Sequence, residues 1–359
     1  MIELYLGDCL EVLKNIPNSS IHCCVTSPPY WGLRDYKNNM QLGLENTPEE
    51  YVNNMVKVFS EIRRVLRHDG TLWLNLGDTY SGSSNTGGTK SIQGTPKHIT
   101  AMTSKGTRRP SQINIKPKNL IGIPWRVAFA LQSNGWFLRQ DIIWHKGNPM
   151  PESVSDRCTK AHEYVFLFSK SEKYYFDNEA IKELSVQNNN QLSDIYTRNR
   201  RSVWTINTKP YPDAHYAVMP TELVKPCILA GTSEKGCCSK CGMPMKRIVS
   251  KKRIRRCELS KEDSRYRPNN YNSSYSEING KSDAGYTVTT TLDWKLQCEC
   301  VNNDIIPCTV LDPFSGSGTV GVVSTDLNRR YIGIELNSDY LALSEKRLNI
   351  VYDKPIIYR

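Results

Sequence analysis

The segment that most constrains the fold of this 359-residue chain is Asp312-Pro-Phe-Ser-Gly-Ser-Gly-Thr319. It follows the apolar run Thr309–Leu311 and precedes a helical pattern near 319–327, after which the run Tyr331–Ile334 ends in Glu335. In such a strand, turn, helix and strand unit, the glycines let the backbone approach a ligand closely, and the helix N-terminus offers its N–H groups. An acid that ends the second strand is suited to bind ribose hydroxyls. The segment therefore predicts a site for a nucleotide-type cofactor.

Strand and helix patterns also alternate along the rest of the chain. The expected helices are Cys9–Ile16, 48–67 and 124–132, and the expected strands are Ile21–Thr26, Thr71–Leu76, Gln140–Trp144 and Glu163–Ser169. This alternation predicts an α/β fold with a mainly parallel sheet. The glycine spacing is not the three-glycine dinucleotide fingerprint, and no Gly-Lys-Ser/Thr follows it, so NAD and ATP are disfavoured as cofactors.

A second unusual segment, Thr26-Ser-Pro-Pro-Tyr-Trp31, stands where the strand Ile21–Thr26 ends. Two consecutive prolines fix the backbone and remove two N–H donors, which leaves carbonyl oxygens as acceptors. Tyr30 can stack on a flipped-out base while the Ser27 hydroxyl and the Pro28 carbonyl accept hydrogen bonds from an exocyclic amino group. An amino nitrogen conjugated to a base is a poor nucleophile, so it needs alignment with an electrophilic methyl group and well-placed acceptors. The segment predicts such a site without a strong general base.

Together the two motifs resemble the amino-methyltransferases of restriction–modification systems and phages, in the permuted β-type order in which the catalytic loop precedes the cofactor loop. The resemblance covers nearly the whole chain, including the central stretch that begins LIGIPWRVAFAL at Leu120. It implies a Rossmann-like methyltransferase fold with a circularly permuted motif order. It also implies that S-adenosylmethionine is the methyl donor. Thr221–Gly231 resembles the helix that precedes the glycine loop and helps to enclose the methionine part of the cofactor.

The resemblance also implies roles for single residues. Asp8 matches the acid that contacts the cofactor adenine, and Glu335 matches the acid that binds the ribose. The catalytic candidates are Ser27, Pro28, Pro29 and Tyr30. The cofactor-binding candidates are Asp8, Asp312, Phe314, Ser315, Gly316, Gly318, Thr319, Glu335 and Asn337.

The target base is inferred from the first position of the catalytic loop. In the family that the chain resembles, serine there is typical of enzymes that methylate N4 of cytosine, and Asp or Asn is typical of N6-adenine enzymes. Ser27 therefore favours N4 of cytosine in double-stranded DNA, with N6 of adenine as the alternative. A C5-cytosine enzyme needs a cysteine nucleophile, and the dipeptides Pro226-Cys227 and Pro307-Cys308 do not stand in a catalytic loop in the expected order.

Four of the twelve cysteines form two close pairs, Cys238-x-x-Cys241 and Cys298-x-Cys300. Thiols in a reducing compartment are better metal ligands than disulfide partners, and four thiolates complete a tetrahedral Zn²⁺ site. The pairs predict a structural zinc ribbon, although Cys237 or Cys257 can replace one ligand and free buried thiols are the alternative. A zinc-ribbon DNA-binding protein that lacks catalytic activity is accordingly a second alternative function.

The formal net charge of +11 predicts attraction to polyanions, and double-stranded DNA is the partner expected from the motifs. The tract 246–256 with nearby tyrosines suits phosphate contact, while a solvated flexible loop explains it equally well. The segments 80–118 and 146–215 are further candidates for target recognition. No apolar run approaches a membrane span of ~20 residues, and the polar start lacks a signal peptide, which predicts a cytoplasmic, nucleoid-associated protein. A cognate restriction endonuclease and a monomeric or homodimeric state are also expected.

These inferences divide the chain into seven segments. They are a catalytic half at 1–79, a polar DNA-facing loop at 80–118, the continuation of the core at 119–184, a target-recognition or linker region at 185–215, the helix before the cofactor loop at 216–235, an inserted zinc ribbon with a basic disordered loop at 236–302, and a cofactor-binding half at 303–359.

Overall fold

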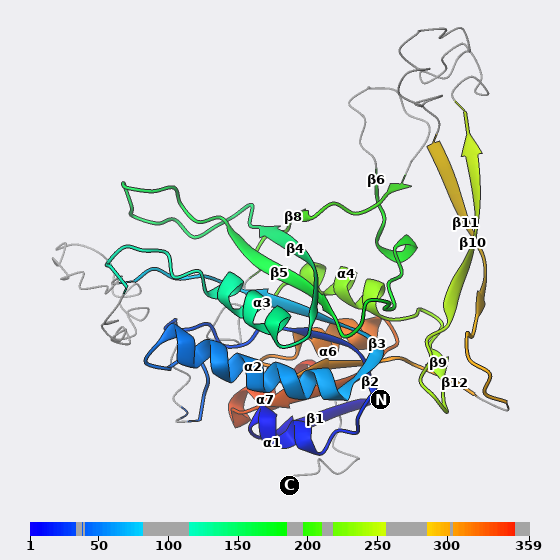
Figure 1. Cartoon of the computed structure of the whole chain (residues 1–359), viewed down its shortest axis with the longest axis horizontal. Coiled ribbons are helices and arrows are strands. Elements are labelled where there is room, and N and C mark those ends of the chain that lie inside the picture. Colours follow the sequence, from blue (N-terminus) through cyan, green and yellow to red (C-terminus); the bar gives the residue numbers. More distant parts are fainter. Residues whose placement is uncertain are drawn as a thin grey trace, which may run out of the picture. The chain divides into compact units, whose positions relative to one another are not determined.

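The structure, a computed structural model, divides the chain into two compact units. The first comprises Met1–Gly236 and Ile306–Arg359, and the second comprises Cys237–Ile305 (Figure 1). The described residues are 1–33, 38, 40–81, 115–184, 197–209, 218–255, 286–301 and 304–348. Most of the expected loop at 80–118 lies outside the described residues, as do residues 256–285 of the inserted segment at 236–302.

An eight-stranded sheet forms the centre of the first unit. Its strands follow the order β1 (Ile2–Leu6), β14 (Arg330–Glu335), β13 (Thr309–Asp312), β2 (Ile21–Thr26), β3 (Leu66–Leu76), β5 (His162–Ser169), β4 (Phe137–His145) and β8 (Val203–Thr205). The first five strands run parallel, β5 is antiparallel to both β3 and β4, and β8 is parallel to β4. The expected mainly parallel sheet is therefore confirmed. The strand β8 lies within the expected target-recognition or linker region at 185–215, and Trp204 of this strand is buried in the core beside Trp73.

Helices cover both faces of this sheet. The helices α1 (Cys9–Lys14), α2 (Pro48–Val65) and α3 (Ile123–Ser133) pack on one face, and α4 (Thr221–Gly231), α6 (Thr319–Asp326) and α7 (Ser338–Arg347) pack on the other. Successive β-strand residues point to opposite faces, so Leu72 and Leu74 join the first core cluster while Trp73 joins the second. Short elements, η2 (Glu179–Ile181), β6 (Glu183–Leu184) and β7 (Thr197–Arg198), complete this unit.

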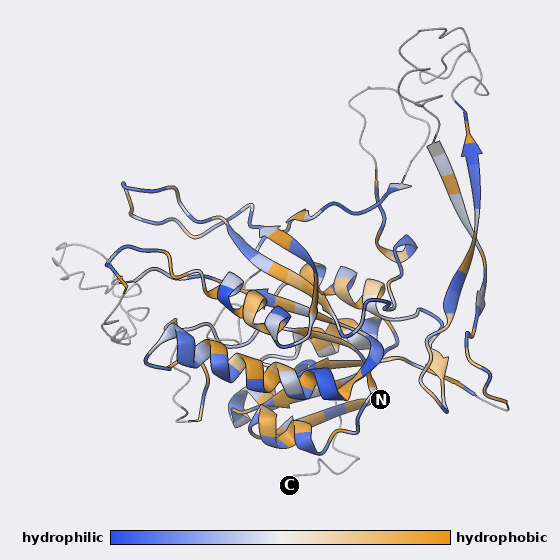
Figure 2. Cartoon of the chain, viewed as in Figure 1, coloured by the Kyte–Doolittle hydropathy of each residue, from blue (hydrophilic) through white to orange (hydrophobic). Residues whose placement is uncertain are grey.

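Helix α2 illustrates why these sequences form these elements. The Thr47 hydroxyl accepts a hydrogen bond from the Glu50 N–H, and Pro48 stands in the first turn, where its missing N–H costs nothing. Tyr51, Met55 and Phe59 are buried at a spacing of four residues, which forms the apolar stripe that Figure 2 shows along the helix. The helix ends at Val65, where the chain passes directly into β3.

The second unit contains an antiparallel ribbon of two strands, β10 (Lys246–Ile254) and β11 (Tyr286–Lys295). At the ends of the unit, β9 (Cys237–Cys238) pairs with β12 (Ile305–Ile306). The basic tract at 246–256, which a solvated flexible loop explained equally well, forms strand β10 of this ribbon over Lys246–Ile254. Ile248, Val249 and the threonines of β11 favour extended backbone, and a ribbon needs no buried face when its strands pair with each other.

The order of the strands determines where a ligand can bind. From β2 the chain crosses through α2 to β3, and from the neighbouring β13 it crosses through α6 to β14 on the other side. Because α2 and α6 cover opposite faces, a crevice opens at the carboxyl ends of β2 and β13. In the described part of the chain, no helix is both long and apolar enough to span a bilayer.

Candidate active site

The two loops singled out in the sequence meet at this crevice. The Ser27–Tyr30 loop follows β2, and the Asp312–Thr319 loop follows β13. The Thr26 hydroxyl donates a hydrogen bond of 2.7 Å to Asp312 Oδ1, which ties the two strand ends together inside the core. Both loops line one cavity of the first unit, together with residues from β3, β4, β5 and β14 and from the turn that follows β1.

The Ser-Pro-Pro-Tyr loop is held in place by hydrogen bonds with α2 and with the segment that precedes this helix. Tyr51 Oη donates to the Pro29 carbonyl at 2.9 Å, and the buried Trp31 donates its indole N–H to the Glu45 carbonyl at 2.9 Å. Among the described residues, no protein group donates to the Pro28 carbonyl, which lies in the cavity lining with Ser27. The loop therefore keeps one carbonyl and one hydroxyl available to an amino group in the cavity.

Tyr30 belongs to a polar network that sequence reasoning did not find. Its hydroxyl donates to Glu163 Oε2 at 2.7 Å and accepts a hydrogen bond from Ser27 Oγ at 3.3 Å. Asn75 Nδ2 also donates to Glu163 Oε2, at 3.2 Å, and Lys146 forms an ion pair with Glu163 Oε1. Three donors thus converge on one carboxylate whose side chain is only 15% exposed.

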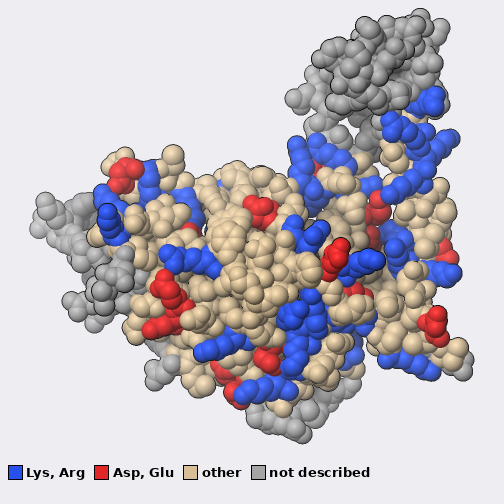
Figure 3. Space-filling model, in the orientation of Figure 1, with Lys and Arg blue, Asp and Glu red and all other residues tan. Residues whose placement is uncertain are grey.

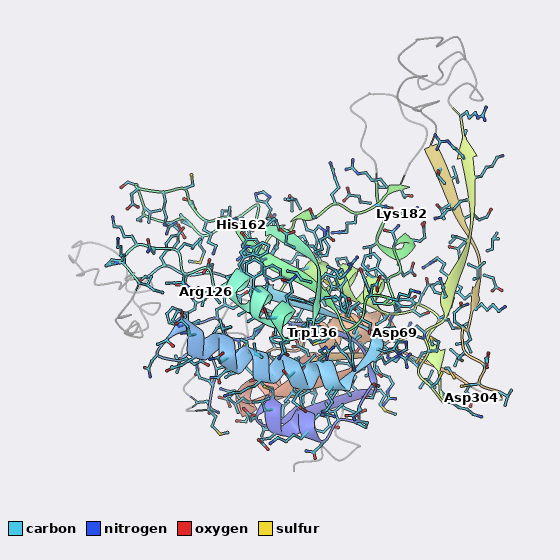
Figure 4. All side chains as sticks on the ribbon, viewed as in Figure 1. Asp69, Arg126, Trp136, His162, Lys182 and Asp304 are labelled. Atoms are coloured by element: carbon cyan, nitrogen blue, oxygen red, sulfur yellow. The ribbon has the colours of Figure 1, made fainter. Side chains whose placement is uncertain are left out.

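Glu163 could have been found from its position on β5. It follows His162, labelled in Figure 4, at the start of a strand that is otherwise apolar. Because β5 is antiparallel to β3, the start of β5 lies at the same edge as the carboxyl ends of the parallel strands. A single acid at the start of an apolar strand is therefore a signal, but it can be used only when the direction of the strand is known.

Gly77 leaves room for the ring of Tyr30. A Cβ atom added at Gly77 would lie 2.5 Å from Tyr30 Cε2. The ring therefore packs directly against the backbone that follows β3, and its hydroxyl is fixed by the network at the other end. Tyr30 has little freedom to rotate.

The cofactor loop presents its backbone to the cavity. Gly316 has φ +53°, and a Cβ there would meet only the Phe314 carbonyl, at 4.0 Å. The Gly316 N–H donates to Glu335 Oε2 at 2.7 Å, and the Asn337 N–H donates to Glu335 Oε1 at 2.9 Å. Glu335 is thereby oriented beside the open space at Gly316, with lone pairs left for a ligand.

Other predicted cofactor residues hold the loop in shape. The Ser315 hydroxyl bonds to Tyr331 Oη at 2.9 Å, and Arg347 Nη1 donates to Thr319 Oγ1 at 2.9 Å. Gly318 does not line the cavity, and a Cβ there would lie 2.2 Å from Ser344 Oγ. A glycine is needed at position 318 because α7 approaches the start of α6 closely.

Asp8 and Asn337 flank the same cavity as helix N-caps. Asp8 Oδ1 accepts from the Leu10 N–H at 2.9 Å at the start of α1, and Asn337 Oδ1 accepts from the Asp339 N–H at 2.8 Å at the start of α7. Both residues line the cavity with Phe314. The edge of the cavity thus carries two helix N-termini as well as the Asp312–Thr319 loop.

Comparison with known proteins identifies the family. Residues 21–238 and 302–346 match the N6/N4 methylase family, described as DNA methylase. The chain belongs to the N6/N4 DNA methylase family. It is 41% identical over 345 residues to the type II methyltransferase M.Cfr9I of Citrobacter freundii, covering 96% of this chain and 87% of that protein. It is also 38% identical over 348 residues to M.SmaI of Serratia marcescens, covering 96% of this chain and 90% of that protein.

Solved structures share the fold of this DNA methylase. PvuII DNA methyltransferase, described as cytosine-N4-specific, superposes with a TM-score of 0.57 at 17% identity and covers 99% of this chain and 88% of its own. A DNA modification methylase of Thermus thermophilus, complexed with S-adenosyl-L-methionine, gives 0.51 at 18% identity and covers 97% and 93%. The predicted Rossmann-like methyltransferase fold is confirmed.

Two carboxyl groups of the methylase line the cavity, one buried (Asp312) and one half-buried (Glu335). Burial raises the pKa of Asp312 to about 7, against the hydrogen bonds from Thr26 and the Phe314 N–H. Burial likewise raises the pKa of Glu335. Both shifts arise because a charged carboxylate loses its hydration in the core, and a cation in the cavity would compensate for that loss.

In the second unit of the methylase, the four predicted metal ligands lie together. The Sγ atoms of Cys238, Cys241, Cys298 and Cys300 are all within 4.8 Å of one another. A tetrahedral site with Zn–S distances of about 2.3 Å separates its sulfurs by roughly 3.8 Å, so this cluster has the size that zinc requires. The pairs precede β10 and follow β11, at the base of the ribbon.

Proposed function

We propose that this DNA methylase transfers the methyl group of S-adenosylmethionine to N4 of cytosine in double-stranded DNA. One observation carries the proposal. An amino-acceptor loop, Ser27–Tyr30, and a cofactor loop, Asp312–Thr319, line the same cavity at adjacent strand ends. The hydrogen bond from the Thr26 hydroxyl to Asp312 joins the two strand ends from which these loops start.

The residues of the cavity fit S-adenosylmethionine. The Glu335 carboxylate suits the ribose hydroxyls, and the open space beside Gly316 admits the nucleoside close to the backbone. Asp312 and Glu335 supply negative charge for a ligand with a cationic sulfonium. When bound, the sulfonium provides an electrophilic methyl group.

The acceptor loop explains how the amino nitrogen becomes reactive. Ser27 Oγ donates to Tyr30 Oη, so its lone pairs remain for one amino hydrogen, and the Pro28 carbonyl accepts the other. Both acceptors hold the nitrogen in line with the methyl group and stabilise the positive charge that develops on it. Transfer would form a new N–C bond as the bond between the methyl group and sulfur breaks, and the methylated nitrogen would then release one proton to solvent water. No covalent bond to the protein is needed.

Ser27 supports cytosine as the target. It is the residue that N4-cytosine enzymes of this family typically carry at this position, and its hydroxyl is neutral. N6-adenine methylation uses nearly the same chemistry and remains the competing product to test for. Relatives with type II names further support a cognate restriction endonuclease as a cellular partner.

The test identifies the product directly. Purified protein is incubated with duplex DNA and S-adenosylmethionine, the DNA is digested to nucleosides, and the methylated nucleoside is identified by mass spectrometry. N4-methylcytosine that disappears in Ser27→Ala and Tyr30→Ala, but not in the α2 surface variant Ser60→Ala, is the expected result. N6-methyladenine would overturn the assignment of cytosine, and no methylated product would overturn the proposed reaction.

We also propose that the four-cysteine cluster holds a structural Zn²⁺. Its support is the mutual distance of the four Sγ atoms and their arrangement in two pairs. Elemental analysis of the purified protein should give one zinc per chain, and Cys241→Ser should lose it. Zinc retained equally in Cys241→Ser and Cys298→Ser would contradict this site.

A further inference from the structure

The ribbon of the second unit is strongly basic. Its two strands carry six basic residues, Lys246, Arg247, Lys251, Lys252, Arg253 and Lys295, and one acid, Asp293. Figure 3 shows lysine and arginine side chains along its length. Lys246, Lys251 and Lys252 are all exposed. The proposed chemistry in the first unit uses none of these side chains.

The strand register places three of the six basic residues on one face of the ribbon and three on the other. Arg247, Lys251 and Arg253 alternate along β10 and therefore share a face. Their direct partners on β11 are Trp294, Thr289 and Thr287, and Thr291 stands opposite Val249. This face thus combines cations with hydroxyl groups and contains no carboxylate. Arginine, lysine and threonine side chains are the groups that proteins use to contact DNA phosphates.

The other face carries an unfavourable pair. Lys246 and Lys295 stand directly opposite each other, and like charges at such cross-strand positions destabilise a ribbon. Lys252 lies on the same face of β10, and Asp293, opposite Ile248, is the acid of that face. A polyanion would relieve this repulsion, because it would neutralise several of these charges at once.

The ribbon also has dimensions that suit duplex DNA, and side-chain contacts of Arg247 join its two strands at one end. Nine residues of β10 span roughly 30 Å, and two-stranded ribbons fit the major groove of B-DNA. The register shift between Ile248 and Val249 adds local twist. At the base, the Arg247 guanidinium lies 4.3 Å from the centre of the Trp294 ring and donates to Thr291 Oγ1 at 3.0 Å.

We propose that the β10–β11 ribbon is a second DNA-binding element that grips the phosphate backbone of duplex DNA. The inference rests on DNA being the substrate and not on which base is methylated. It assigns DNA affinity to the inserted unit, whereas the chemistry belongs to the first unit. Lys251 and Lys252, on opposite faces of β10, are the central contacts.

The test measures how DNA binding depends on salt. Each phosphate contact contributes about 0.9 to the slope of log K against log salt concentration. Replacing Lys251 and Lys252 together by glutamine in the full chain should lower that slope by about 1.8 and weaken duplex binding at low salt. Replacing both by arginine should retain the wild-type slope. Affinity for S-adenosylmethionine, measured without DNA, should be unchanged and would show that the first unit is folded, while one zinc retained per chain would show that the second unit is folded.

The matched control removes the same charge elsewhere. Lys14 on α1 and Lys57 on α2 are exposed lysines of the first unit, and their replacement by glutamine should alter the slope far less. An equal fall in both double variants would mean that only net charge matters and would overturn the proposal. An unchanged slope in the ribbon variant, or binding that falls only for single-stranded DNA, would overturn it as well. Because the readout is binding, the result is independent of which methylated nucleoside the enzyme makes.

Discussion

At the scale of single residues, the most informative side chain is Glu163, whose carboxylate is contacted by three donors although the side chain is largely shielded from solvent. Its carboxylate holds the Tyr30 hydroxyl, and Tyr30 in turn accepts the hydrogen bond of Ser27. In the proposed reaction, Glu163 would be a positioning residue that acts on the target amine through Tyr30 and Ser27. Its ion pair with Lys146 fixes the carboxylate from the other side.

Replacing Glu163 by glutamine should lower kcat about tenfold to a hundredfold, because a hydrogen bond to a charged group contributes about 1.5–3 kcal/mol. The KM for S-adenosylmethionine should change little, since Glu163 acts on the acceptor loop. Tyr30→Phe should have a similar effect, and the double variant should be no worse than the poorer single variant. Additive losses in single-turnover kinetics would show that the two residues act separately.

The buried carboxyl of Asp312 predicts a pH dependence of cofactor binding. Its pKa of about 7 means that the group is largely protonated at pH 6 and ionised at pH 8. A cationic cofactor favours the ionised form, so binding releases a proton and the affinity rises with pH until it levels off above the pKa. Calorimetry should give a Kd about tenfold higher at pH 6 than at pH 9. Asp312→Asn should flatten this profile, and an equally steep profile in that variant would assign the titration to another group.

At the scale of elements, the sequence predicts most of the first unit and little of the second. Apolar periodicity locates the strands around Ile21–Thr26 and Glu163–Ser169 and the helix at 48–67, because their burial depends on residues close in sequence. It misses β8, which owes its place in the sheet to Trp204. It also misses the β10–β11 ribbon, which is stabilised by pairing across more than thirty residues and has no buried face.

The same limit applies to the site. The loops around Ser27 and Gly316 carry local motifs, so their residues can be found from the sequence alone. Glu163, Asn75 and Lys146 come from three separate strands or strand ends and share no motif. Only the antiparallel direction of β5 brings them to one edge of the sheet. Roles that depend on such long-range register need the structure.

The start of α6 gives a prediction about packing. Gly318→Ala should lower the free energy of unfolding by about 2–4 kcal/mol, because a left-handed φ is combined with a clash against Ser344. Gly122→Ala is the matched control, since Gly122 has nearly the same φ but open space around it, and should cost about 1 kcal/mol. Urea unfolding measures both. Adding Ser344→Ala to Gly318→Ala should restore part of the loss, and equal effects at the two glycines would refute the clash.

At the scale of the whole molecule, the two units should lose their structure separately. Removing zinc with a chelator should unfold the second unit, because a two-stranded ribbon is at best marginally stable by itself. All described residues that line the cavity belong to the first unit, which should still bind S-adenosylmethionine with unchanged affinity. Calorimetric scans with and without chelator should show one transition lost and one retained. Loss of cofactor binding on chelation would mean that the units fold as one.

The two ends of the second unit lie close together, so this unit is inserted into the first at a single place. The strands at its two ends, β9 and β12, pair with each other, and the Ser239 N–H donates to the Asp304 carbonyl at 2.9 Å (Figure 4 labels Asp304). Paired strands lie about 4.8 Å apart, so a short linker can span the junction. The segment between these strands should therefore be replaceable as a block by a short linker, because both of its ends meet at one place.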